Sequence, residues 1–209
     1  VISSTLLKRV DGEIQKRLPS ILKRQGLNLL KNARLQTIEE HEGTLLITAA
    51  DKKKKEIKIE AEYLLMATGR RPYFDTLNLE STGVAFTPKG IAVNQFFETN
   101  IQGIYAVGDV IGGMMLAHVA SHEAIDAVEY IMGKTPHTNY NVVPDCVFIH
   151  PEISCVGLTE EKAIEKGIAY STSKSLLAMK RQSLAMGNND GFIKVIAEKE
   201  TQVILGVHI

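Results

Sequence analysis

The pattern of apolar and polar positions predicts both helices and strands along the 209 residues. Ile14, Leu18 and Ile21 recur at helical spacing between Lys and Arg residues, which predicts a helix from Asp11 to Gly26. A second helix is predicted over 116–132. Short apolar or alternating runs predict strands at 27–30, 35–40, 44–50, 56–61, 63–68, 91–100, 103–109, 146–150, 153–158, 192–198 and 203–209.

These predicted elements fall into two kinds of fold. The continuous apolar run from Tyr63 to Thr68 is typical of a strand that is buried in an α/β sheet. A polar linker with two prolines follows at 133–145 and is the best candidate for a domain boundary. After it, Thr159 is expected to cap a short helix, and the remaining strands indicate an α+β unit with antiparallel pairing.

The overall composition excludes several classes of partner. Lys plus Arg equals Asp plus Glu, so a zero net charge gives no electrostatic footprint for nucleic acid or an anionic membrane. No apolar run approaches the roughly 18 residues of a membrane span. The lysine run at 52–55 is interpreted as a solvated hairpin tip. The chain begins at Val1 and stops within a predicted strand, so both ends are expected to be cuts in a longer polypeptide.

Only two cysteines occur, Cys146 and Cys155, and they form no Cys/His cluster with the spacing of a zinc site. We expect no bound metal. Both are expected to be buried, inert strand cysteines. A reducing, cytoplasmic setting fits this cysteine usage.

The strongest chemical signal is the Gly108-Asp109 pair, which follows a predicted buried strand. A carboxylate at the carboxyl edge of a sheet lies where ligands bind in α/β folds, and it commonly accepts hydrogen bonds from ribose or ribityl hydroxyls. The predicted helix that begins near Met115 directs backbone N–H groups and a positive dipole end toward the same place. A reduced flavin suits both features, and an Asp that only caps a turn remains the alternative.

A second motif, Ala-Thr-Gly-Arg-Arg-Pro at 67–72, places Gly69 and paired arginines after a predicted strand. With the Gly-Asp pair, Met-Leu-Ala-His at 115–118 and His-Pro-Glu at 150–152, its order and spacing resemble the pyridine nucleotide–disulfide oxidoreductases. These are FAD enzymes such as dihydrolipoamide dehydrogenase, glutathione reductase and mercuric reductase. The resemblance covers essentially the whole chain, and within the family it is greatest to the dihydrolipoamide dehydrogenases.

The resemblance implies a set of residues that bind FAD or NAD: Asp109, Met115, Leu116, Ala117, His118, Gly69 and Leu35. Asp109 is implied to hold the ribityl chain of FAD, with the helix start lying against the flavin. Gly69 is implied to contact NAD. Leu35 matches a residue at the adenine, although core packing explains it equally well. The His118 side chain is expected to pack while its backbone makes the contact.

The implied fold is α/β and α+β, namely part of a flavoprotein with two dinucleotide-binding domains plus most of its interface domain. Residues 1–68 are expected to be the C-terminal part of the NAD-binding domain. Residues 69–140 are expected to be the central FAD-binding segment, and 141–209 the truncated interface or dimerisation domain. A homodimer is therefore expected.

The implied reaction is NAD-dependent oxidation of protein-bound dihydrolipoamide through a redox disulfide and FAD, with the lipoyl domain of 2-oxoacid dehydrogenase complexes as partner. The family's Cys-x4-Cys pair, its two glycine fingerprints and its downstream catalytic His-Pro and Glu are missing from these 209 residues. No catalytic residue is therefore assigned, and the chain alone is expected to be inactive. His150-Pro151-Glu152 is expected to be structural rather than a substitute.

Three questions stay open at this stage. The substrate could be another disulfide or mercuric ion within the same family, or the chain could be a non-catalytic binding module. NAD and NADP are not distinguished, because the acidic or basic residues that read the ribose 2′ position lie at the end of a strand that is missing from this sequence. Ser3 and Ser4 fall in or near the loop that follows that strand.

Overall fold

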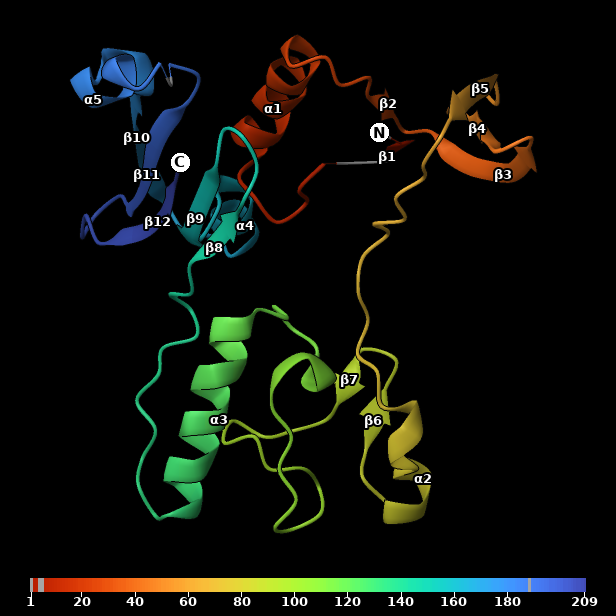
Figure 1. Ribbon diagram of the computed structural model, residues 1–209. Coiled ribbons are helices and arrows are strands. Elements are labelled where there is room, and N and C mark those ends of the chain that lie inside the picture. Colours follow the sequence, from red (N-terminus) through yellow and green to blue (C-terminus); the bar gives the residue numbers. More distant parts are fainter. Residues whose placement is uncertain (1, 4–5, 188) are drawn as a thin grey trace. The chain divides into compact units, whose positions relative to one another are not determined.

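The computed structural model describes residues 2–3, 6–187 and 189–209, so Ser4 lies outside the described residues. The chain divides into two compact units, one made of 1–65 and 144–209 and the other of 66–143 (Figure 1). Its α-helices are α1 (Gly12–Arg24), α2 (Leu79–Thr82), α3 (Ala117–Ile131), α4 (Glu160–Glu165) and α5 (Arg181–Ala185), and its 3-10 helices are η1 (Asp75–Leu77), η2 (Gly108–Ile111) and η3 (Leu177–Met179).

The strands build four small sheets. They are β1 (Ile2–Ser3), β2 (Leu30–Lys31), β3 (Arg34–His41), β4 (Thr44–Ala50), β5 (Glu56–Ala61), β6 (Phe86–Thr87), β7 (Gly90–Ile91), β8 (Asp145–Val147), β9 (Ile153–Gly157), β10 (Tyr170–Leu176), β11 (Phe192–Glu198) and β12 (Ile204–His208). The first unit holds an antiparallel sheet in the order β10-β11-β12-β9-β8, a meander β3-β4-β5, and the parallel pair β1-β2. The second unit holds the β6-β7 pair.

The mixed helix and sheet content confirms the predicted α/β and α+β class. The antiparallel pairing predicted for the C-terminal part is also confirmed. Along β11 the side chains alternate between buried and partly exposed, as expected for a strand covered on one face. Thr159 caps α4 as predicted, because its hydroxyl accepts a hydrogen bond from the Lys162 N–H at 3.3 Å.

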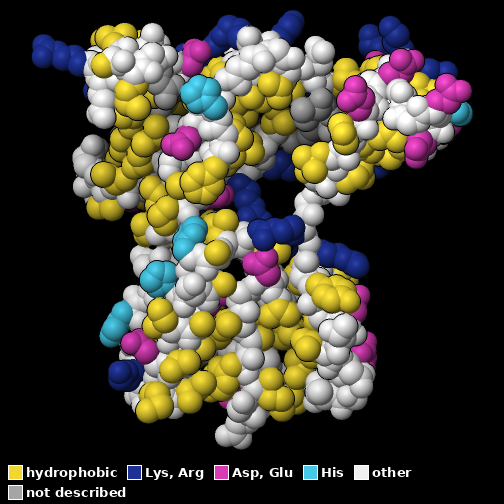
Figure 2. Space-filling view, viewed as in Figure 1, with side chains coloured by type: hydrophobic (Ala, Val, Ile, Leu, Met, Phe, Trp, Pro, Cys, Tyr) yellow, Lys and Arg dark blue, Asp and Glu magenta, His cyan; other side chains and the backbone are white. Residues whose placement is uncertain are grey.

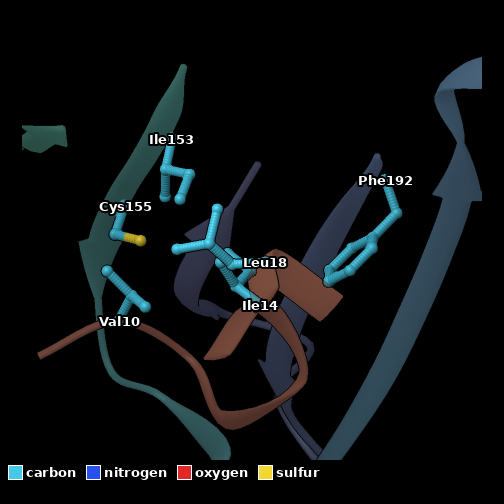
Figure 3. Packing of buried hydrophobic residues seen from close by; sticks show 6 residues of the cluster. All are labelled: Val10, Ile14, Leu18, Ile153, Cys155 and Phe192. Carbon is cyan, nitrogen blue, oxygen red and sulfur yellow. The ribbon is translucent and has the colours of Figure 1, made fainter. Parts of the chain in front are cut away.

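Helix α1 forms where its periodicity predicts it. The Asp11 side chain accepts a hydrogen bond from the Glu13 N–H at 3.0 Å, which satisfies one of the unpaired donors of the first turn. Ile14 and Leu18 are buried against Phe192 of β11 and their neighbours (Figure 3). Burying side chains of this kind stabilises a fold by about 2 kcal/mol each.

The strand predicted at 27–30 is shorter than expected. The end of α1 is closed by hydrogen bonds from the Gly26 N–H to the Lys23 carbonyl and from the Leu27 N–H to the Leu22 carbonyl, each 3.1 Å long. These residues complete a helix C-terminus instead of entering a sheet, so β2 begins only at Leu30.

The buried strand predicted at Tyr63–Thr68 is wrong. No part of this segment pairs with another strand among the described residues. Tyr63 is 87% exposed and Leu65 is 88% exposed. An apolar run becomes a buried parallel strand only when strands flank it and other elements cover both faces, and the described chain supplies neither to this segment.

The two strands predicted at 91–100 and 103–109 are also largely wrong. Outside β7, the only pairing described there is an isolated bridge between Glu98 and Tyr105. Gly103 and Gly108 take positive φ values of 80° and 76°, which interrupt an extended run. Gly108 begins the turn η2 rather than ending a strand.

The second unit packs its short elements around Leu79, Val84 and Ile91, which form a small apolar cluster. Helix α3 runs from Ala117 to Ile131, within one residue at each end of the predicted bounds.

In the part of the chain that is described, no helix combines the length and the apolar character that crossing a bilayer requires. Figure 2 shows acidic and basic side chains of both signs on the visible face, in keeping with the zero net charge.

Candidate cofactor site

Arg70 joins the two sequence motifs in the second unit. Its guanidinium donates a hydrogen bond of 2.9 Å to the Asp109 carboxylate and another to the Met115 carbonyl oxygen. The motif at 67–72, the turn η2 and the start of α3 therefore meet at one side chain. The Asp109 side chain remains 48% exposed and keeps room to accept hydrogen bonds from a ligand.

The turn that carries Asp109 is fixed from behind by a buried carboxyl group. The Gly108 N–H donates a 2.6 Å hydrogen bond to the Glu123 side chain of α3. Burial raises the pKa of Glu123, the Gly108 N–H lowers it, and the negative charge of Asp109 raises it, so that the net shift is upward. Glu123 thus couples helix α3 to the position of Asp109.

The N-terminus of α3 is suited to negative charge. Leu116 precedes the helix in extended conformation, no side chain caps the first turn, and no acidic residue lies in that turn. Backbone N–H groups and the positive end of the helix dipole therefore act together at this end. Met115 has a φ of 50°, an uncommon value for a non-glycine residue, where the chain turns into the helix.

At Gly69 a ligand can come close to the protein backbone. Its φ is 108°, and a Cβ placed there would meet no atom within 4 Å. The position therefore combines a conformation that favours glycine with open space beside it. An exposed carboxylate, an uncapped helix start and this glycine are the features that a hydroxyl-bearing, anionic cofactor requires, so the residues present fit an FAD or NAD group.

The structure brings some of the predicted site residues together and not others. Asp109 and Met115 share Arg70 as a partner, and Leu116, Ala117 and His118 follow directly at the start of α3. Ala117 and His118 are exposed. Leu35 is half-buried in β3, opposite Ala49 of β4, and belongs to the other unit.

Sequence reasoning missed the roles of Arg70 and Glu123. The Arg-Arg pair indicated that this segment binds phosphates or carboxylates, but it did not indicate that Asp109 is the partner of Arg70. Glu123 stands six residues after Ala117, on the buried face of α3, where Val119, Asp126 and Ala127 are also buried. A carboxylate on a buried helix face is the signal that could have identified it.

The cysteine prediction is half wrong. Cys155 of β9 is buried, but Cys146 is exposed on the edge strand β8, where its Sγ lies 3.0 Å from the Ser154 hydroxyl. Burial alternates along this strand, and Cys146 lies on its more exposed face, between the partly buried Asp145 and Val147. The residues described include no group of His, Cys, Asp or Glu side chains that could hold a metal ion.

Comparison with known proteins places this geometry in a family. Residues 2–124 match the model of the pyridine nucleotide-disulphide oxidoreductases, and 143–209 match the dimerisation domain of the same family. The chain is 38% identical over 209 residues to the mitochondrial dihydrolipoyl dehydrogenase of Pisum sativum, covering 99% of this chain and 42% of that protein. It is 37% identical to the leghemoglobin reductase of Glycine max, covering 99% and 40%.

Solved structures agree with these sequence relatives. The HOCl-induced flavoprotein disulfide reductase RclA from Escherichia coli superimposes with a TM-score of 0.86 at 27% identity, covering 99% of this chain and 47% of that one. The chain spans about two fifths of the length of the curated relatives it matches. It belongs to the pyridine nucleotide-disulphide oxidoreductases, a family that uses FAD and NAD.

Proposed function

We propose that this chain is the central and C-terminal part of an FAD-dependent dihydrolipoyl dehydrogenase, which oxidises protein-bound dihydrolipoamide with NAD. The observation that carries the proposal is the convergence of Arg70, Asp109 and the start of α3 in one place. Dihydrolipoyl dehydrogenases among the sequence relatives support this choice of reaction.

Each candidate residue has a specific role in this proposal. Asp109 accepts hydrogen bonds from the ribityl hydroxyls of FAD, and the backbone N–H groups of 115–118 stabilise negative charge on the flavin. FAD supplies the electron-transfer chemistry between the dithiol and NAD. In the second unit, Gly69 allows the nicotinamide cofactor to approach the backbone. In the first unit, Leu35 keeps its predicted role beside an adenine.

The chain holds cofactors in this proposal but does not itself react. It contains no Cys-x4-Cys pair, and neither Cys146 nor Cys155 is assigned a redox role. We therefore expect the 209 residues alone to show no dehydrogenase activity. We also propose that residues 141–209 form a homodimer interface and that lipoyl domains are the protein partners. Several relatives are mitochondrial by name, which counts against the cytoplasmic setting predicted from the sequence.

A chimeric enzyme tests the proposal. The segment of the Pisum sativum dihydrolipoyl dehydrogenase that aligns with this chain is replaced by these 209 residues, so that the host supplies the remaining machinery. We expect the purified chimera to retain flavin and to oxidise NADH in a lipoamide-dependent manner. The Asp109→Ala chimera should lose flavin, whereas Asp75→Ala, which alters an exposed carboxylate outside the site, should not.

The outcomes separate the alternatives. A folded chimera that never retains flavin would contradict the assignment of Asp109 and the α3 start. A chimera that retains flavin but does not act on lipoamide would favour another disulfide reductase of the family, for which the similarity to RclA speaks. Activity of the unfused 209-residue chain would contradict the expectation that it lacks catalytic residues.

A further inference from the structure

A lysine is buried within the first unit at a position where the strand pattern requires an apolar residue. Lys194 lies on the covered face of β11 between Phe192 and Ile196, and its side chain is only 4% exposed. Its Nζ lies 3.0 Å from both carboxylate oxygens of Asp11, whose side chain is 0% exposed. The same ammonium group pairs with Glu160.

These charged groups come from two different parts of the family fold. Asp11 caps the start of α1 and lies in the 2–124 match to the oxidoreductase model. Lys194 of β11 and Glu160, the first residue of α4, lie in the 143–209 match to the dimerisation domain. The cluster therefore joins helix α1 to the part of the chain that matches the dimerisation domain.

The buried ammonium group of Lys194 has a carboxylate partner for each of its hydrogen-bond donors. The three donors of the ammonium group are matched by the two oxygens of Asp11 and by Glu160. Burial lowers the pKa of Lys194, but its hydrogen bonds to Glu160 and Asp11 outweigh that effect and the net shift is upward. The ion pair is therefore retained. Glu13 of α1 also lies 3.8 Å from the ammonium group, so Lys194 keeps carboxylate partners when Asp11 is neutralised, whereas removing Lys194 leaves the Asp11 charge buried without its cation.

The Lys194–Asp11 pair is closed off from water, whereas the Glu160 side chain remains 31% exposed. Val10 precedes Asp11 and packs with Ile153 and Cys155 of β9, as Figure 3 shows. In the sheet, Lys194 lies opposite His208, which is 1% exposed. The exposed side chain of Glu161 lies against Gly12 at the helix start. In such apolar surroundings a paired charge is strongly stabilised and an unpaired one is costly, so the energy of the ion pair depends strongly on its geometry.

We propose that Lys194 is a positioning residue that locks the start of α1 onto the dimerisation domain, so that the two parts move as one body. The hydrophobic driving force of the apolar contacts has no direction, whereas the ion pair requires one particular arrangement of its atoms. The charged contact fixes one register. This inference depends on the contacts within the chain and holds whichever substrate the family member uses.

Hydrogen exchange of the intact 209-residue chain tests the lock. In Lys194→Met, the apolar side chain keeps most of the volume but leaves Asp11 without its counter-charge. We expect the amides of α1 to exchange about a hundredfold faster, with a much smaller change in β11 and β12. Lys58→Met removes an exposed lysine that lies 3.4 Å from Glu56 and should leave α1 unchanged.

A second variant separates the lock from the helix cap. Asn caps helices as well as Asp does, so Asp11→Asn keeps the bond to the Glu13 N–H while removing the charge. We expect faster α1 exchange in this variant too, and a double variant Asp11→Asn/Lys194→Met that is no worse than the more damaging single one. Equal acceleration in α1 and the sheet, or additive effects of the two substitutions, would overturn the proposal.

Discussion

Arg70 and Asp109 are 39 residues apart in the sequence, yet their side chains form a hydrogen-bonded ion pair of 2.9 Å. The same guanidinium also binds the Met115 carbonyl oxygen. Two motifs that the sequence presents separately are therefore one structural element. Arg70 orients the carboxylate that is proposed to hold the flavin and anchors the turn into α3.

Replacing Arg70 with Ala should alter flavin binding more than stability. The Arg70 and Asp109 side chains are 62% and 48% exposed, so solvent screens their attraction and the free energy of unfolding should fall by less than about 1 kcal/mol. In the chimeric enzyme, however, Asp109 loses its orienting partner and flavin content per subunit should fall. Urea unfolding and flavin absorbance measure the two effects.

The neighbouring Arg71 supplies the control for this substitution, because it is also exposed and no contact with Asp109 is described for it. Arg71→Ala should leave flavin content unchanged. Equal flavin loss in both variants would show that positive charge in general, and not the bond to Asp109, retains the cofactor.

Glu123→Gln should change how stability depends on pH. The pKa of Glu123 is raised above its ordinary value of 4.5, mainly by burial, so the folded protein holds this proton more tightly than the unfolded chain. Its contribution to stability is fully present below pH 4.5 and is lost as the pH rises through the raised pKa. The neutral Gln cannot show this loss and still offers an oxygen to the Gly108 N–H.

Urea midpoints of the wild type and the variant, measured from pH 4 to pH 8, give the test. The variant should gain stability relative to the wild type as the pH rises. Glu129→Gln, which removes a carboxylate of the same helix without altering the bond from the Gly108 N–H, serves as the control. A constant difference between Glu123→Gln and wild type across this range would rule out the proposed titration.

Some elements could be predicted from sequence because their signals are local. Helix α1 has its periodicity, its Asp11 cap and its Gly26 stop within one segment, and α3 is equally self-contained. The hairpin β11-β12 carries its own pairing partner a few residues away. Tyr63–Thr68 is different, because whether it is a strand depends on neighbours that the run itself does not contain.

The candidate site was predictable in its chemistry but not in its contacts. Asp109 and the α3 start are residue types whose preferences point to a ligand. Their orientation depends on Arg70, which approaches from another segment, and on Glu123, whose only local signal is its place on a buried helix face. The Lys194 cluster was missed for a related reason, since a Lys on a strand is ordinarily solvent-exposed and its partner Asp11 is remote in sequence.

The two cysteines should differ sharply in reactivity. Burial raises the pKa of Cys155 from 9.0 to about 11, although the Asp11 backbone opposes the shift. Its thiolate population at pH 8 is therefore about a hundredfold smaller than that of an ordinary cysteine, and its sulfur is also inaccessible. A thiol reagent such as DTNB should label one thiol rapidly in the folded chain and two in urea. Cys146→Ser should abolish the rapid phase, and a rapid phase that persists would contradict the assignment.

Gly112→Ala should destabilise the second unit more than Gly113→Ala does. Both glycines have positive φ, 79° and 74°, so both substitutions carry the conformational cost of that region, about 1 kcal/mol. Only at Gly112 would a Cβ collide with the Lys89 carbonyl, a backbone atom that cannot rotate away, whereas a Cβ at Gly113 meets nothing within 4 Å. The difference between the two variants therefore isolates the contact between the turn η2 and the residues before β7.

We expect the free energy of unfolding to fall by a further amount of about 1–3 kcal/mol for Gly112→Ala, measured by urea unfolding. Equal losses in the two variants would mean that the Lys89 segment moves aside, and that this close approach does not hold Asp109 in place.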